Sequence, residues 1–178
     1  GSFNVIENNE IYKVSDQLDT PYGCQLLNLL GNNNIVRGNT FSRMGSGANC
    51  LGLMFEWDLA DVNLIENNTF RDVPVAISLQ GGDGNIIRNN YFEAAVSDAR
   101  AGIVIASYDD RSDWPCNEPD SISPPDNPDH PEYGYYYPHD CHSKNNKVIG
   151  NTFVGFETDW IMQPVTMESN IFSDNSSR

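Results

Sequence analysis

An eight-residue phrase recurs six times along the chain and limits what the chain can fold into. Its template is Asn-x-(Ile/Val)-x-(Asn/Gly)-Asn-x-Phe, and the sixth copy matches least well. Coiled repeats of about 20 to 30 residues are typical of solenoids, in which stacked units bury a shared core. The copies are residues 4–11, 34–41, 63–70, 85–92, 146–153 and 165–172, and the sixth position is Asn in each: Asn9, Asn39, Asn68, Asn90, Asn151 and Asn170.

The phrase predicts a short strand, a corner at the Asn residues and a second short strand. Its third and eighth positions are apolar in all six copies, so they are expected to point into the core. Asn tolerates the left-handed backbone conformation of a sharp corner. Its amide can also bond to the equivalent Asn one coil away and form a ladder. The 22 Asn of the sequence are therefore largely architectural.

Between the phrases lies a second kind of strand, in which apolar and other residues alternate. The aligned segments are 23–27, 52–56, 76–80, 102–106 and 159–163. The first alignment is open, because the run 26–30 allows a slip of register. The positions predicted to face the core are Cys24/Leu26, Leu53/Phe55, Ile77/Leu79, Ile103/Ile105 and Trp160/Met162. Those predicted to face outward are Gln25/Leu27, Met54/Glu56, Ser78/Gln80, Val104/Ala106 and Ile161/Gln163.

This pattern resembles the right-handed parallel β-helix proteins with pectate-lyase-like repeats, which bind carbohydrate or hydrolyse sugars. Among Asn-rich versions it is similar to the archaeal disaggregatase-related surface proteins. The resemblance covers residues 3–173 apart from 108–144, and implies an all-β solenoid of about six coils with one long insertion. It also implies a substrate groove on the outward face of the alternating strand. Residues 1–2 look like a cloning scar.

The net charge and the cysteine content limit the partners and the cellular compartment that the sequence predicts. With 25 acidic and 10 basic residues the net charge is -15, which argues against nucleic acid or an anionic membrane as partner. No apolar run is long enough to span a membrane. Four cysteines without a C-x-x-C motif favour two disulfides, Cys24–Cys50 and Cys116–Cys141, in a secreted or cell-surface protein. A free buried Cys24 thiol is the alternative.

Carboxylates that follow the alternating strands are the candidate catalytic groups. Asp83 and Asp109 each stand seven residues after the first aligned residue, which predicts neighbouring coils about 4.8 Å apart. That spacing suits a retaining glycoside hydrolase, whereas Glu56 and Asp109, about 10 Å apart, would suit an inverting one. Solvated turn carboxylates are the alternative interpretation. The full candidate catalytic set is Glu56, Asp83, Asp109, Asp110 and Arg111.

The insertion 108–144 is rich in Pro and Tyr and holds all three His, so it is expected to pack beside the groove. Aromatic rings there could stack on sugars, or they could merely cover the coil. The candidate substrate-binding residues are Trp57, Asp58, Gln80, Tyr108, Trp114, Tyr135, His139 and His142. No cofactor is required and no His-based metal site is specified, although Asp109, Asp110, Asp113 and Glu118 offer oxygen ligands to Ca²⁺.

The sequence therefore predicts an extracellular, carbohydrate-active β-helix that cleaves a polysaccharide with acid and base carboxylates. Three alternatives stay open: a glycan-binding module without catalysis, a structural or adhesion module, and a polysaccharide lyase. Scarce basic residues on the groove face weaken the lyase interpretation. Neighbouring domains or an oligomer are expected to cover the open ends of the coil.

Overall fold

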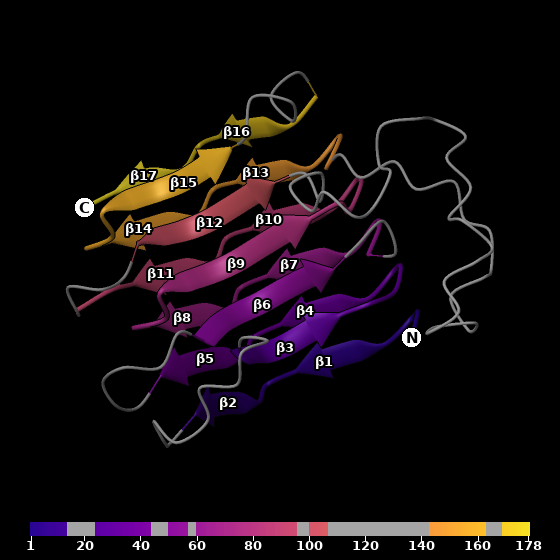
Figure 1. Cartoon of the computed structure of the whole chain (residues 1–178), viewed down its shortest axis with the longest axis horizontal. Coiled ribbons are helices and arrows are strands. Elements are labelled where there is room, and N and C mark those ends of the chain that lie inside the picture. Colours follow the sequence, from indigo (N-terminus) through magenta and orange to yellow (C-terminus); the bar gives the residue numbers. More distant parts are fainter. Residues whose placement is uncertain (14–23, 44–49, 57–59, 96–99, 107–142, 163–168) are drawn as a thin grey trace, which may run out of the picture.

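The chain is an all-β solenoid built from three parallel sheets. The computed structural model describes residues 1–13, 24–43, 50–56, 60–95, 100–106, 143–162 and 169–178. These ranges contain the strands β1 to β17 and no helix, so no helix within them could cross a membrane. The strands stack from β1 at one end of the molecule to β16 and β17 at the other (Figure 1). The predicted parallel β-helix is confirmed.

Each eight-residue phrase supplies one strand to each of two sheets. Sheet A contains β1 (Val5–Glu7), β4 (Ile35–Arg37), β7 (Leu64–Glu66), β10 (Ile86–Arg88), β13 (Lys147–Ile149) and β16 (Ile171–Ser173). Sheet B contains β2 (Glu10–Lys13), β5 (Thr40–Arg43), β8 (Thr69–Arg71), β11 (Tyr91–Glu93), β14 (Thr152–Val154) and β17 (Ser176–Ser177). Sheet C holds the alternating strands β3 (Cys24–Leu29), β6 (Cys50–Glu56), β9 (Val75–Gln80), β12 (Ala101–Ala106) and β15 (Thr158–Met162).

Two Asn ladders run along the stack, one at the sixth position of the phrase and one at the first. In each, the backbone N–H of one Asn donates to the Oδ1 of the Asn on the next coil, at 2.8–3.0 Å. The predicted ladder at the sixth position is confirmed, and the ladder at the first position was not predicted. The ladders are Asn9–Asn39–Asn68–Asn90–Asn151–Asn175 and Asn4–Asn34–Asn63–Asn85–Asn146–Asn170.

The sixth copy of the phrase begins five residues later than predicted. Asn170 accepts the N–H of Asn146 and so occupies the first position, while Asn175 occupies the sixth. Phe172 pairs with Val148 in sheet A, which makes it a third-position residue. The prediction that Asn170 and Phe172 fill the sixth and eighth positions is wrong. A single Asn and a single Phe match the template at two offsets, and only the stacking on the previous coil selects one.

The residue before each ladder Asn, apart from Asn170, turns the chain through a left-handed backbone conformation. In the sixth-position ladder φ lies between 53° and 64°, and the residues are Asn8, Gly38, Asn67, Asn89, Gly150 and Asp174. Asn, Asp and Gly adopt this conformation more readily than other residues. Val62 does the same before Asn63, although a β-branched side chain is disfavoured there. The predicted left-handed corner is confirmed.

The core is a column of aromatic rings under sheet B, faced by aliphatic side chains from sheet C. Phe41, Phe70, Phe92 and Phe153 are fully buried and stack with centroids 4.7–5.0 Å apart. A Cβ on Gly102 would lie 2.5 Å from the Phe153 ring, so the small residues of sheet C make room for this column.

The first strand of sheet C lies in a different register from the one predicted. Leu27 pairs with Leu53 and Leu29 with Phe55, so these two leucines take the core positions assigned to Cys24 and Leu26. The run of leucines offers an apolar residue in either register. Pairing of Cys24 with Cys50 fixes the one observed.

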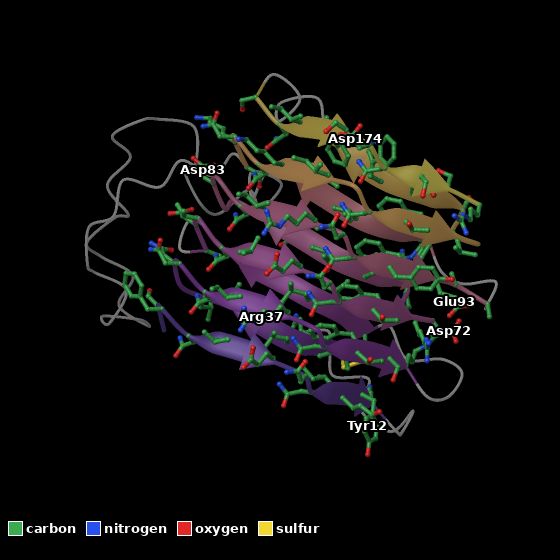
Figure 2. All side chains as sticks on the ribbon, turned by 180° about the vertical axis from the view of Figure 1, so that it is seen from behind. Tyr12, Arg37, Asp72, Asp83, Glu93 and Asp174 are labelled. Atoms are coloured by element: carbon green, nitrogen blue, oxygen red, sulfur yellow. A yellow bond between two sulfur atoms is a disulfide. The ribbon has the colours of Figure 1, made fainter. Side chains whose placement is uncertain are left out.

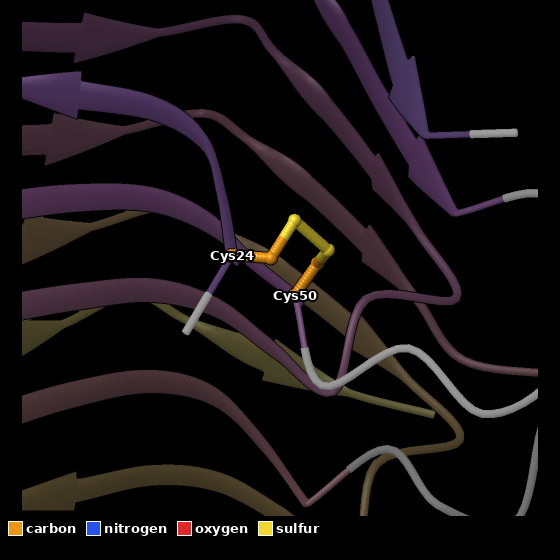
Figure 3. The surroundings of a disulfide bond; sticks show 2 residues. All are labelled: Cys24 and Cys50. Carbon is orange, nitrogen blue, oxygen red and sulfur yellow. A yellow bond between two sulfur atoms is a disulfide. The ribbon is translucent and has the colours of Figure 1, made fainter. Parts of the chain in front are cut away.

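Cys24 and Cys50 form a disulfide between neighbouring strands, as predicted (Figure 3). Their Cα atoms lie 4.4 Å apart at the start of β3 and β6, and Cys50 is fully buried. Cys116 and Cys141 lie outside the described residues. The bond ties two successive coils together and is favoured in an oxidising compartment.

Replacing a ladder Asn is expected to cost far more than replacing its neighbour. Asn68 is 1 % exposed, donates to Asn90 and to the Val36 carbonyl, and accepts from Asn39. Asn68→Ala should therefore lower the free energy of unfolding by about 3–5 kcal/mol, since several buried polar groups lose partners.

Asn67→Gly is the matched control, because glycine favours the φ of 54° found there. It should change the stability by less than about 0.5 kcal/mol. Chemical denaturation of both variants provides the measurement. Equal losses would contradict the ladder's role.

Candidate functional site

Most of the predicted site residues lie outside the described part of the chain. Their roles stay predictions, because nothing in the structure bears on them. They are Trp57, Asp58, Tyr108, Asp109, Asp110, Arg111, Trp114, Tyr135, His139 and His142. The described residues include Gln80, Asp83 and the backbone of Glu56, which pairs with Gln80 in sheet C.

The outer face of sheet C, where the groove was predicted, is largely closed at its centre. Met54 and Ser78 occupy neighbouring outward positions, as expected, yet they are only 6 % and 3 % exposed. The Gln80 side chain donates to the Ser78 hydroxyl at 3.3 Å. The described residues of this face therefore leave few polar groups for a ligand.

Ala106, the last residue of β12, and Ser143, where the described chain resumes, lie within hydrogen-bonding distance of each other. The buried Ser143 hydroxyl donates to the Ala106 carbonyl at 3.0 Å and accepts the Gly81 N–H at 2.9 Å. One side chain thus holds the end of β12, the residue after β9 and the segment that begins at Ser143 together.

Asp83 belongs to a third ladder, at the corner that precedes sheet A. Its Oδ1 accepts the Lys144 N–H at 2.6 Å, and its own N–H donates to Asp61 Oδ1 at 2.8 Å. The same pattern continues through Asn32 and Ser2. On the coil that follows Asp83, the matching position is held by Lys144. The hydrogen bonds of Asp83 therefore join neighbouring coils, independently of any catalytic role of its carboxylate.

Asp61 is a titratable group that sequence reasoning missed. Burial raises the pKa of its carboxyl, and the hydrogen bond from the Asp83 N–H lowers it in part. Because the Asp83 N–H donates to Asp61 Oδ1, the two carboxylates lie on neighbouring coils. The signal was present in the sequence, because each member of this ladder stands two residues before a first-position Asn.

The outer face of sheet B carries mainly hydroxyl groups. The seventh position of the phrase faces outward there, next to the inward-facing eighth position. We define the sheet B row as Glu10, Thr40, Thr69, Tyr91, Thr152 and Ser176, which are register neighbours. Strand spacing places them about 4.8 Å apart along the solenoid.

A second outward row on sheet B adds an aromatic ring and an ion pair. Tyr12 is 51 % exposed and Tyr91, in the first row, is 37 % exposed. Arg71 Nε lies 3.4 Å from Glu93 Oε2. Figure 2 places Tyr12 and Glu93 toward one side of the molecule, with Arg37 of sheet A and Asp83 on the other. Sheet B therefore offers hydrogen-bonding groups, ring faces and a balanced charge pair.

Comparison with known protein families identifies a match to the first part of the chain. The protein-family model described as "Periplasmic copper-binding protein (NosD)" matches residues 1–111. Searches of curated proteins and of solved structures found no significant match.

Removing the charge of Asp61 is expected to stabilise the protein in a pH-dependent way. Because the folded-state pKa is raised, the protonated carboxyl favours folding at low pH, and this contribution is lost as pH rises through the folded pKa. Asp61→Asn should therefore be more stable than the original chain at pH 7. The advantage should shrink toward pH 4, near the ordinary carboxyl pKa of about 3.9.

Thermal unfolding across this pH range provides the measurement. Asp72→Asn is the control, since Asp72 Oδ1 also accepts a backbone N–H, that of Ala95. An Asp61→Asn advantage that stayed constant with pH would show that burial of the charge is not its cause.

Proposed function

The chain belongs to the NosD family of periplasmic proteins, and on that premise we propose that it is an extracytoplasmic glycan-binding module that holds an extended polysaccharide against sheet B. The observation that carries the proposal is the sheet B row, in which five of six side chains end in a hydroxyl. Binding, without cleavage, is the activity these groups can provide.

The hydroxyl groups of the sheet B row match the chemistry of a sugar polymer. A Ser, Thr or Tyr hydroxyl both donates and accepts a hydrogen bond, as each sugar hydroxyl does. The coils repeat these groups at a regular interval of about 4.8 Å, so a regular chain laid along the solenoid meets equivalent partners coil after coil. Ser176 Oγ already donates to Thr152 Oγ1 at 3.2 Å, which shows that hydroxyls of neighbouring coils come within bonding distance.

The exposed tyrosines supply the apolar part of such a contact. Tyr12 and Tyr91 lie on different coils and expose about half and a third of their surface. Aromatic rings carry a large apolar area with a polar tip and suit partners with one apolar and one wet side, as a sugar ring has. Arg71 and Glu93 are paired at 3.4 Å, so Glu10 at the end of the sheet B row is the one further charged side chain in the two rows, and most of the face carries no net charge. A neutral glycan is thus the favoured ligand.

The other two faces support this function less well. On sheet C, Met54 and Ser78 are almost fully covered. On sheet A, the outward positions hold aliphatic and paired charged side chains. The Cys24–Cys50 disulfide agrees with an extracytoplasmic setting, in which extracellular or envelope glycans are the accessible polymers.

Cleavage of the polysaccharide is a second proposal, favoured by the carboxylates of Asp61 and Asp83 on neighbouring coils. A carboxyl whose pKa is raised by burial is suited to act as a general acid. Both carboxylates, however, accept backbone N–H bonds within the coil. The remaining candidates, Asp109, Asp110 and Arg111, lie outside the described residues, so binding is the better supported of the two activities.

The described residues do not fit a copper site, although the family description names copper. They include no His and no group of three or more His, Cys, Asp or Glu. Both cysteines among them form the disulfide, Met54 is 6 % exposed, and Met162 packs partly buried against the core. Copper favours imidazole, thiolate and thioether ligands, and the three histidines of the sequence all lie outside the described ranges.

Glycan binding is tested by screening the full chain against a glycan array and measuring affinity for the best neutral polysaccharide. Tyr91→Ala should weaken binding by roughly fivefold to tenfold, because one ring contact is lost. Ile171→Ala is the control, since Ile171 is also exposed but lies on sheet A. Circular dichroism checks that both variants stay folded.

The same mixtures are analysed for cleavage products and repeated with Cu²⁺. Products that disappear in Asp83→Asn would support cleavage as well as binding. Binding of Cu²⁺ with no glycan bound would contradict the proposal. So would an equal loss of affinity in Tyr91→Ala and Ile171→Ala.

A further inference from the structure

The outer face of sheet A carries two parallel rows that end together. We define the sheet A face as the aliphatic row Val5, Ile35, Leu64 and Ile86 with the charged row Glu7, Arg37, Glu66 and Arg88. Successive members of each row are paired in register on adjacent strands, about 4.8 Å apart. On the fifth strand, β13, the aliphatic row continues with the charged Lys147 and the charged row with the aliphatic Ile149. The face therefore spans four coils.

The charged row alternates in sign along the solenoid. Arg37 binds Glu7 at 2.6 Å and Arg88 binds Glu66 at 2.7 Å, each within one pair of neighbouring coils. These groups stay partly open to solvent, with Arg37 and Arg88 side chains 48 % and 46 % exposed. Their remaining hydrogen-bonding capacity can serve a partner, because a guanidinium carries five N–H donors.

Because the charges alternate in sign over four coils, the row on one copy is complementary in charge to the same row on a second copy whose solenoid axis runs in the opposite direction. When a second copy faces the first with its axis reversed, Glu7 meets Arg88 and Arg37 meets Glu66. In the same arrangement the aliphatic rows meet each other, with Val5 against Ile86 and Ile35 against Leu64. If the two axes ran in the same direction, the aliphatic and charged rows would oppose each other instead. Only the antiparallel arrangement satisfies both rows.

We propose that the sheet A face is a self-association surface on which a second copy of this chain docks antiparallel to the first. A two-fold axis along the strand direction relates the copies, so the contact closes as a dimer. Burial of the aliphatic row supplies the attraction, and the charged row selects the orientation, as exposed ion pairs contribute little energy by themselves.

Exposed apolar residues beside the aliphatic row extend the contact. Phe3 is 80 % exposed and Val62 is 59 % exposed, and each stands two residues before a member of the row. Val5 itself is 53 % exposed. Even so, four three-residue strands make a narrow interface, below the roughly 1,200 Å² of a stable complex. The dimer is therefore weak and depends on concentration.

Sedimentation equilibrium of the full chain tests the proposal up to about 1 mM protein in about 0.15 M salt. The mass should rise from 19.9 kDa toward twice that value and no further. Leu64→Lys, which places a charge opposite Ile35 of the second copy, should raise the dimer dissociation constant at least about tenfold. Thr69→Lys is the matched control, because Thr69 lies on the same coil but on sheet B. It should leave the constant unchanged.

The orientation is tested with a variant in which all four charges are inverted, E7R/R37E/E66R/R88E. This variant keeps the alternation and should form dimers with itself. Against the original chain, however, it places Glu opposite Glu and Arg opposite Arg, so mixed dimers should be scarce. Mixed dimers at the statistical proportion would overturn the antiparallel assignment. A single monomeric species throughout, or equal effects of Leu64→Lys and Thr69→Lys, would overturn the surface itself.

Discussion

The rest of the structure depends on the hydrogen bond from the backbone N–H of one ladder Asn to the amide oxygen of the next. Ladder residues such as Asn39, Asn68 and Asn90 are buried where the chain turns, so a corner N–H there is shielded from solvent and needs a protein partner. The side chain of the next coil provides it. Each coil thus fixes the position of its neighbour, and every outward row inherits the same regular spacing.

Much of the fold could be predicted from the sequence because the pattern repeats. Five strong copies of the phrase determined the strands, the corner and one Asn ladder. The errors fall where local pattern is ambiguous: the leucine run allows two registers for β3, and the degenerate last copy fits its template at two offsets. In both places, pairing with the adjacent coil decides, and a single sequence does not contain that information directly.

The candidate site was harder to predict than the fold. Sequence reasoning looked for catalytic groups after sheet C and in the insertion, where chemically reactive residue types concentrate. It did not examine the second, fourth and seventh positions of the phrase, although these define the outer faces of sheets A and B. Both proposed binding faces are formed by variable positions of the repeat, such as Thr69 and Arg37, whereas the invariant positions, such as Asn68, hold the coils together.

Amide hydrogen exchange tests most directly whether the ladders hold the solenoid together. The N–H groups of Asn39, Asn68 and Asn90 donate to buried amide oxygens, so they should exchange only through global unfolding, with protection equal to the full stability of the chain. The N–H of Asn67, which donates to Arg88 at an exposed corner, should exchange faster. Ladder amides that exchanged as fast as Asn67 would contradict the account.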